Sequence, residues 1–237
     1  RSKKEGMWAT IDAPLPPIKP YEFEGTVTSI HSSSSLFVTK DTETKLIFLN
    51  NLAIPYFYFN KSGGAEPYGF EAREFLRTHY VGQRVKVNVD GAYSSANTSP
   101  EFQSSYVREY ATVFHNKACI NVDLVKNGLA RYHDSYCDRN SHIQSQIKQA
   151  EQEAKNRQIG LHSPAPIPAI EIHDLTKRTN RRDLMEAINQ LRNNEHEGII
   201  EFVASSSKFY VFIPKFGYLL RSEINGILPY QPNDKFA

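Results

Sequence analysis

Disulfide frameworks, membrane spans and a large net charge are all missing from this sequence of 237 residues. Its two cysteines, Cys119 and Cys137, are too few for a disulfide framework, and no apolar run approaches the roughly 18 residues of a membrane span. Lys and Arg number 28 against 26 Asp and Glu, which excludes a strongly basic arm. We therefore expect a reducing compartment, with a cytoplasmic location and the nucleus as the alternative, no membrane partner, and basic surface only from local clustering.

Metal-ligand and phosphate-loop motifs are also missing. Neither cysteine has a Cys-x-x-Cys partner, the eight histidines are scattered, and no glycine-rich phosphate loop occurs. The sequence therefore predicts no metal and no cofactor. Residues 1–6 are charged, begin without Met and lead into no apolar segment typical of a signal peptide, so we expect a piece of a longer protein.

Proline-rich segments divide the chain. Four prolines fall within residues 9–20 and three within 163–168, so both segments are expected to be stiff, extended linkers. Between them, runs of β-branched and aromatic residues predict strands, and apolar residues at helical spacing predict helices. The expected strands are 21–31, 35–40, 44–52, 84–89 and 106–114, and the expected helices are 68–80, one marked by Val122, Val125 and Leu129, and one from Ile143 to about Gly160.

This order of three strands, a helix, two strands and two helices predicts an α+β fold in which five short strands form a small Greek-key barrel. After the second linker, apolar spacing from Leu184 to Leu191 predicts another helix. Three more strands are expected at 197–204, 207–213 and 217–224.

These last strands repeat the first three. Glu24-Gly25-Thr26-Val27 matches Glu197-Gly198-Ile199-Ile200, an offset of 173 residues, and Leu36-Phe37-Val38 matches Phe209-Tyr210-Val211 at the same offset. Chance similarity between two β-meanders is the alternative. The repeat predicts four segments: 1–20, the tail of a preceding repeat with a linker; 21–162, a complete domain; 163–195, a linker with a helix; and 196–237, an incomplete second domain.

Three helical segments carry a resemblance to a known family. Residues 67–77 resemble the first-helix signature of staphylococcal-nuclease-like domains, residues 120–130 resemble the second helix, and residues 149–162 resemble the closing helix with its Gly-Leu-His end. The resemblance implies an OB-fold barrel of five strands with three helices, followed by the first strands of a second such barrel. Tandem copies joined by proline linkers are similar to the Tudor staphylococcal nuclease family, and the segment resembles its third repeat with the start of the fourth.

The resemblance also implies a Ca²⁺-dependent nuclease site, whose groups are mostly missing here. The family has an Asp-Gly-Asp-Thr turn where this chain has His31 and four serines, an Arg where it has Phe48, and an Asp-Thr-Pro-Glu turn where it has residues 53–56 (Ala-Ile-Pro-Tyr). Arg108 matches the remaining arginine. Because serine hydroxyls do not replace ionised carboxylates as Ca²⁺ ligands, we expect no catalytic residues and no cleavage from this segment. A cryptic site using Asp41, Glu43 or Glu66 is the alternative.

Clustered cations are the candidates for binding nucleic acid. Cations at the start of a helix oppose its macrodipole, so those before the linker helix are explained either by phosphate contact or by ion pairs with acids such as Glu186. Cations on the barrel strands could ring one groove in which Tyr56 offers a stacking surface, whereas Phe57 and Phe59 are expected in the core. The candidate residues are Lys177, Arg178, Arg181 and Arg182 at the helix, with Arg84, Lys86, Arg108, Lys40, Lys45 and Tyr56 on the barrel.

The sequence thus predicts a catalytically degenerate, RNA-binding segment. The RNA is single-stranded or structured, and the resemblance implies other repeats of the same protein and ribonucleoprotein complexes as further partners. It also implies a role in RNA silencing, RNA decay or transcriptional co-activation. The alternatives are a protein-interaction scaffold, which would show an exposed apolar groove, and residual phosphodiesterase activity of an RNA endonuclease.

Overall fold

A computed structural model describes residues 19–57, 59, 65–95, 106–134, 141–176 and 181–226. These residues form two compact units. Unit 1 contains residues 68–167 and the described residues before 57, and unit 2 contains residues 168–226 and the described part of 57–67. The described part of residues 57–67 groups with unit 2, although it lies within the first expected domain.

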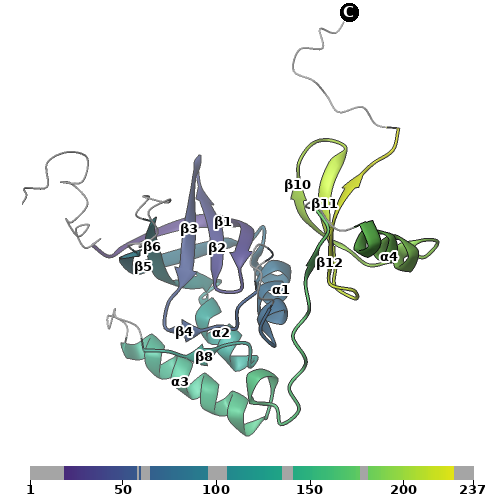
Figure 1. The fold of residues 1–237 in the computed structure, drawn as a ribbon. Coiled ribbons are helices and arrows are strands. Elements are labelled where there is room, and N and C mark those ends of the chain that lie inside the picture. Colours follow the sequence, from purple (N-terminus) through teal and green to yellow (C-terminus); the bar gives the residue numbers. More distant parts are fainter. Residues whose placement is uncertain are drawn as a thin grey trace, which may run out of the picture. The chain divides into compact units, whose positions relative to one another are not determined.

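Unit 1 is built on a sheet that closes into a barrel (Figure 1). The strands lie in the order β3-β2-β1-β5-β6-β7, and β3 also pairs in parallel with β6, which closes a barrel of five strands. The predicted α+β barrel is therefore confirmed. The strands are β1 (Tyr21–Ser32), β2 (Ser35–Lys40), β3 (Glu43–Leu49), β5 (Arg84–Ser95), β6 (Tyr106–His115) and the short β7 (Ala118–Cys119).

Three helices complete unit 1: α1 (Gly69–Tyr80), α2 (Ile120–Lys126) and α3 (Ser141–Asn156). Helix α3 buries Ile143, Ile147, Ala150 and Ala154, which recur at helical spacing on one face. Helix α2 ends before Gly128, whose φ of 69° lies in the left-handed region that favours glycine. A short 3₁₀ turn, η1 (Gly160–His162), follows α3, and β4 (Leu52–Ala53) pairs with β8 (Arg131–Tyr132).

Alternation in β5 separates the core from the outer face of the barrel. Val85, Val87 and Val89 are buried, whereas Arg84 and Lys86, at the alternate positions, are exposed. Successive side chains of a strand point to opposite faces, so the apolar pattern that fills the barrel also places these cations on its surface.

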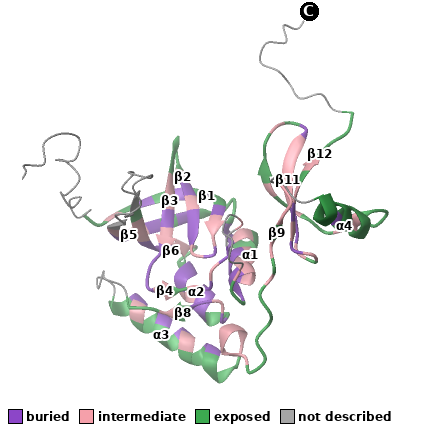
Figure 2. Cartoon of the chain, viewed as in Figure 1, coloured by how far each residue is buried: buried purple, intermediate pink, exposed green. Residues whose placement is uncertain are grey.

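Unit 2 is a smaller sheet with one helix. Strands β10 (Ile199–Val203), β11 (Lys208–Ile213) and β12 (Tyr218–Glu223) form an antiparallel meander, and β9 (His173–Asp174) pairs with β12 in parallel. Helix α4 (Arg181–Leu191) buries Ala187 and is otherwise mostly exposed (Figure 2). Within the described residues no helix is long and apolar enough to cross a membrane.

Aromatic rings form the centre of unit 2. The Phe212 ring centroid lies 6.1 Å from that of Phe57 and 5.0 Å from that of Phe59, both edge-on. Phe57 and Phe212 are fully buried. The prediction that Phe57 belongs to a core is confirmed, although the core is that of unit 2.

Candidate nucleic-acid interface

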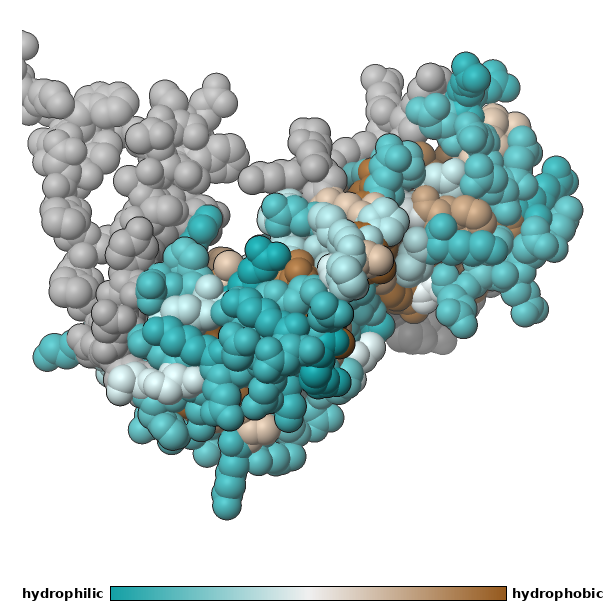
Figure 3. Space-filling model, turned by 90° about the horizontal axis from the view of Figure 1, so that it is seen from below, coloured by the Kyte–Doolittle hydropathy of each residue, from teal (hydrophilic) through white to brown (hydrophobic). Residues whose placement is uncertain are grey.

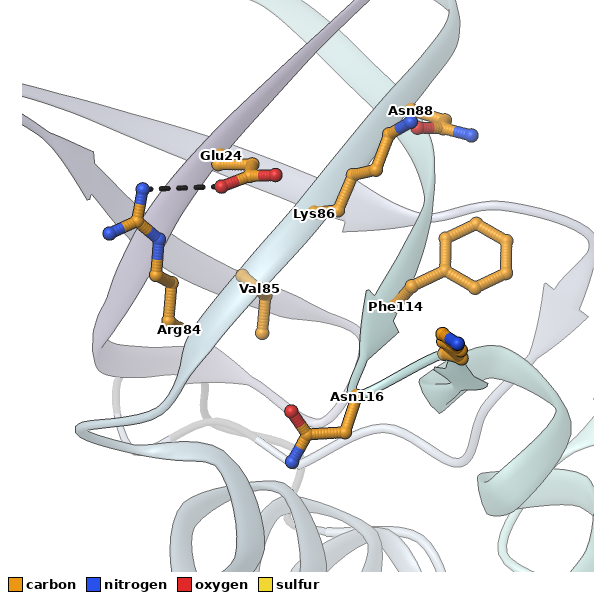
Figure 4. Close-up of a pocket in the computed structure, with 8 residues that line it drawn as sticks. Glu24, Arg84, Val85, Lys86, Asn88, Phe114 and Asn116 are labelled. Atoms are coloured by element: carbon orange, nitrogen blue, oxygen red, sulfur yellow. Dashed lines mark hydrogen bonds and ion pairs between the residues drawn. The ribbon is translucent and has the colours of Figure 1, made fainter.

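A hollow of about 540 Å³ lies on the outer face of β1, β5 and β6 in unit 1. Figure 4 shows the Arg84, Lys86 and Asn88 side chains rising from β5, with Glu24 of β1 and the Phe114 ring of β6 beside them. The lining combines cations, amides, one acid and apolar atoms. Its residues are Glu24, Arg84, Val85, Lys86, Asn88, Phe114, Asn116 and Lys117.

Two of these cations form exposed ion pairs across the β1–β5 ladder. Arg84 Nη2 lies 3.2 Å from Glu24 Oε2, and Lys86 pairs with Glu22. The register places Glu24 opposite Lys86, so both ion pairs are diagonal. Exposed pairs of this kind contribute about 0–1 kcal/mol, so a phosphate could take the place of either carboxylate at low cost.

A two-residue turn supplies the third cation. Asn116 and Lys117 have φ of 47° and 70°, the left-handed pair that joins β6 to β7 in a tight hairpin. Lys117 is exposed, and in the part of the chain that the structure describes it has no ion pair. The hollow therefore has three cations, of which Arg84 is paired with Glu24 and Lys86 with Glu22, which lies outside the lining.

Lys40 and Lys45 lie away from this hollow. Lys45 Nζ donates to the Tyr21 hydroxyl at 3.0 Å, and that hydroxyl donates to the Glu109 carboxylate at 2.8 Å. The bond to Tyr21, ahead of the cost of burial, raises the pKa of Lys45. Lys45 is therefore half-buried and hydrogen-bonded to a neighbouring strand of the barrel, whereas Lys40 is exposed at the end of β2.

Arg108 is also outside the hollow. Its guanidinium carbon lies 5.4 Å from the centre of the Phe48 ring, which is 5.6 Å from the Tyr110 ring. Of the predicted barrel cations, Arg84 and Lys86 line this hollow, whereas Lys40, Lys45 and Arg108 do not. Tyr56, which is half-buried, is not among the lining residues either.

The helix cluster belongs to unit 2. Arg181 and Arg182 are exposed in the first turn of α4, together with Asp183. Lys177 and Arg178 lie outside the described residues.

The serine turn at the position of the family's metal-binding acids is closed by hydrogen bonds. Ser33 is buried and its Oγ donates to the Pro55 carbonyl at 2.6 Å, which ties this turn to the second one that the family uses for acids. Ser32 and Ser35 exchange a hydrogen bond of 2.6 Å between their hydroxyls. The residues present therefore do not fit a Ca²⁺ ion, since hard cations need several charged or carbonyl oxygens that are free to coordinate.

His31 precedes the serine turn and is the nearest titratable group to it in sequence. Burial, followed by the charge of Arg73, lowers the pKa of His31, so the imidazole is neutral at physiological pH. Within the described ranges, no group of three or more His, Cys, Asp or Glu side chains could hold a metal ion. The acid Asp41 stands at φ 52° in the β2–β3 turn, as the sequence predicts for a turn acid.

Asn88, Phe114, Asn116 and Lys117 were not among the predicted site residues. The alternation of β5 could have pointed to Asn88, which lies on the same face as Arg84 and Lys86. Lys117 could not be found in this way, because the two-residue β7 that creates its turn is too short to predict. Cys119 in β7 is buried, and burial raises the pKa of its thiol to about 11, which fits the predicted small core residue rather than a nucleophile.

The chain is similar to nuclease homologues. Residues 47–164 match the family model described as staphylococcal nuclease homologue. The chain is 26% identical over 252 residues to Staphylococcal nuclease domain-containing protein 1 of Drosophila melanogaster, covering 96% of this chain and 26% of the relative. It is 29% identical over 217 residues to the protein of that name from Schizosaccharomyces pombe, covering 89% and 24%.

A plant relative has a different name. Ribonuclease TUDOR 1 of Arabidopsis thaliana is 23% identical over 274 residues, covering 96% of this chain and 27% of the relative. The chain therefore spans about a quarter of the length of the curated relatives it matches.

Proposed function

Because residues 47–164 and the relatives place the chain in the family of staphylococcal nuclease homologues, of the kind found in Tudor staphylococcal nucleases, we propose that its barrel binds RNA without cleaving it. The observation that carries the proposal is the hollow on β1, β5 and β6, where three cations and two amides stand around an aromatic ring. Phosphates are bound by such cations, and bases by amide groups and aromatic faces.

The paired acids set the strength of this binding. Glu22 and Glu24 partly neutralise Lys86 and Arg84, so an incoming phosphate must replace a carboxylate at each of these two positions. Lys117, which has no ion pair within the described residues, offers the first contact. The expected result is moderate affinity that falls steeply with salt, since each phosphate contact on a single strand lowers the slope of log K against log salt by about 0.7.

Absence of cleavage is proposed from the residues at the two nuclease turns. The serine hydroxyls bond to one another and to the Pro55 carbonyl, and Phe48 stands where the family has an arginine. Hydroxyl groups that are already bonded within the protein supply neither the negative charge nor the free oxygens that hold Ca²⁺ against a phosphate. Residual phosphodiesterase activity therefore has no support from the described residues.

A charge-reversal experiment tests the RNA-binding surface. The variant Arg84→Glu/Lys86→Glu/Lys117→Glu should weaken binding of a labelled single-stranded RNA at least about tenfold and reduce the salt slope. The matched control is Lys126→Glu/Arg157→Glu/Lys155→Glu, which reverses three exposed cations in the helical part of unit 1. Equal loss in both variants would show that only the overall charge matters, and would contradict the proposed surface.

A second variant tests the helix cluster separately. Reversing Lys177, Arg178, Arg181 and Arg182 together should weaken binding if unit 2 also contacts the phosphates. If RNA binding depends on this cluster and not on the hollow, the proposed site is wrong although the proposed function stands. Comparing the loss of RNA affinity in the hollow variant with that in the helix-cluster variant therefore shows which surface contacts the RNA.

For the whole protein we propose ribonucleoprotein complexes as partners, in RNA silencing, RNA decay or transcriptional co-activation. A cytoplasmic location, with the nucleus as the alternative, is part of the same proposal. A scaffold role would need an exposed apolar surface. The face of the chain drawn in Figure 3 is mostly hydrophilic, but β10 in unit 2 exposes Ile200, Phe202 and Val203.

A further inference from the structure

His115, the last residue of β6, is bonded to two residues that line the hollow of unit 1. Its Nδ1 lies 3.0 Å from the Arg84 carbonyl oxygen of β5, and its Nε2 lies 2.9 Å from Nδ2 of Asn116, the next residue in the chain. Arg84 and Asn116 are lining residues, and His115 is half-buried beside them. The imidazole is therefore a titratable neighbour of the hollow to which the proposed function gives no part.

The two bonds fix the position of the ring proton when His115 is neutral. A carbonyl oxygen only accepts hydrogen bonds, so Nδ1 must carry a hydrogen and donate it to the Arg84 carbonyl. Nε2 then has no hydrogen in the neutral ring and accepts one from the Asn116 amide. Because Nδ2 of Asn116 is directed at the ring, Oδ1 is the end of the amide that remains for a ligand in the hollow.

A second proton on the ring reverses the bond to Asn116. Protonated Nε2 is a donor, and two donors repel each other, so the Asn116 amide must turn and offer Oδ1 to the ring. Asn116 is exposed, so the surrounding side chains leave it room to turn. Protonation thus adds a positive charge beside the hollow and exchanges an acceptor at its wall for a donor. Both changes favour a phosphate oxygen.

The charges around the ring determine how the proton and a phosphate affect each other. The Tyr80 ring of α1 stands edge-on to the imidazole with centroids 6.0 Å apart, and its hydroxyl donates to Asp123 of α2 at 3.0 Å. The charged and titratable groups near the ring and the hollow are Arg84 and Lys86 of β5, Glu24 of β1, Tyr80 and His79 of α1, Asp123 of α2, Cys119 of β7 and Lys117 of the turn.

Cations outnumber acids on the side of the hollow, where they oppose a further positive charge on His115. A phosphate in the hollow offsets these cations and so favours the protonated ring. By linkage, the protonated ring then favours the phosphate by the same factor.

We propose that His115 is a proton switch of the RNA site in unit 1, which turns the Asn116 amide and raises the affinity of the hollow for phosphates when its ring is protonated. The proposal rests on the proposed function of the hollow. Histidine is the side chain that ordinarily changes charge near neutral pH, whereas carboxylate, lysine and arginine side chains ordinarily keep theirs. RNA binding should therefore become tighter as the pH falls from about 8 to about 5.5.

Anisotropy titrations at these two pH values test the switch, with labelled oligouridylate as the RNA because uracil takes up no proton in this range. The affinity of the unmodified chain should rise about twofold to fivefold more than that of His115→Gln, as expected for one exposed charge. His142→Gln removes an exposed histidine of α3 and is the matched control, which should keep the full rise. Slow hydrogen exchange of β5 and β6 at both pH values verifies that the barrel stays folded.

A second variant and nuclear magnetic resonance separate the charge from the amide. Asn116→Ala should keep only part of the rise, because the ring still gains its charge but no amide donor turns to the hollow. The ring nitrogen shifts of His115 should show the Nδ1–H tautomer at the higher pH. Adding oligouridylate at a fixed pH between the two should increase the protonated fraction of His115 but not that of His142.

The outcomes distinguish the switch from the proposed function. An equal rise in the unmodified chain and in His115→Gln, or an Nε2–H tautomer at the higher pH, would overturn the switch and leave RNA binding intact. A full rise in Asn116→Ala would overturn the turning of the amide. RNA that binds at neither pH would contradict the proposed function, and the switch with it.

Discussion

Two meanders of similar sequence and the same register are buried to very different degrees in the two units. Val27 and Ile30 of β1 are 0% and 8% exposed, whereas their counterparts Ile200 and Val203 are 60% and 63% exposed. The strand sequences do not cause this difference, because β10 is as apolar as β1. In unit 1 both residues belong to a core cluster that also contains residues of β2, β3, β5, β6 and α2, and the described residues of unit 2 include no counterparts of β5 and β6.

The largest expected effect is on stability, when the equivalent residues Val27 and Ile200 are each replaced by Asp. Val27→Asp places an unpaired charge in the barrel core and should destabilise unit 1 by about 4 kcal/mol or more, whereas Ile200→Asp should change stability by about 0.5 kcal/mol or less. Hydrogen exchange resolved by region, followed through urea denaturation, measures each unit separately. Equal destabilisation by the two variants would mean that the edge of β10 is covered in solution.

The equivalent glycines Gly25 and Gly198 differ in what an added Cβ atom would contact, which gives a second, smaller contrast in stability between the units. A Cβ on Gly25 would lie 2.7 Å from the Thr39 carbonyl oxygen, a backbone atom, whereas at Gly198 the nearest backbone atom is the Phe212 oxygen at 3.6 Å. Gly25→Ala should therefore cost about 1–3 kcal/mol, and Gly198→Ala less than about half as much, since only a valine side chain must move. Thermal unfolding of both variants measures the two losses of stability, and the loss should be larger for Gly25→Ala than for Gly198→Ala.

The serine turns give the third contrast. Ser33→Ala removes the buried hydrogen bond to the Pro55 carbonyl and should cost about 1–2 kcal/mol, whereas Ser206, its counterpart in unit 2, is exposed and should be neutral when replaced by Ala. Denaturant midpoints measure both variants. If Ser33→Ala is also neutral, the Ser33 bond does not hold the serine turn and the turn at Pro55 together.

The smallest effect is the contribution of His31 to the pH dependence of the stability of unit 1. Burial and Arg73 lower the pKa of His31 in the folded state, so the unfolded state binds the proton more readily and the stabilising contribution of the neutral imidazole is lost as pH falls below about 6.5. His31→Gln should flatten the fall in stability of unit 1 between pH 7 and about pH 5 without changing stability at pH 8. Unit 2 has Ala204 at this position, so the substitution His31→Gln should leave the stability of unit 2 unchanged.

Local pattern was sufficient to predict the barrel, because core positions recur with the period of each element. The spacing of the three valines in β5 and of the apolar residues in α3 predicts that they are buried, and they are. The grouping of Phe57 with unit 2 could not be predicted, since nothing local shows that Phe57 packs on Phe212, more than 150 residues later.

The candidate site was predicted only in part. Arg84 and Lys86 were identified from alternation, but their partners Glu24 and Glu22 depend on the β1–β5 register, which the sequence does not reveal. Lys45 was predicted as a binding cation, and the structure shows in addition that it bonds to Tyr21. Cross-strand pairing decides whether a surface cation is available, and pairing is a tertiary property.

One measurement tests the central claim, that this barrel has kept RNA binding and lost cleavage. A labelled single-stranded RNA is titrated with the chain in Ca²⁺ and again in a Ca²⁺ chelator, and the same samples are read for anisotropy and for RNA length. The account predicts equal binding in both, weakened by salt and by reversal of Arg84, Lys86 and Lys117, with the RNA intact throughout. Shortened RNA that appears only with Ca²⁺ and is lost in Arg108→Ala, or affinity that does not respond to salt, would contradict it.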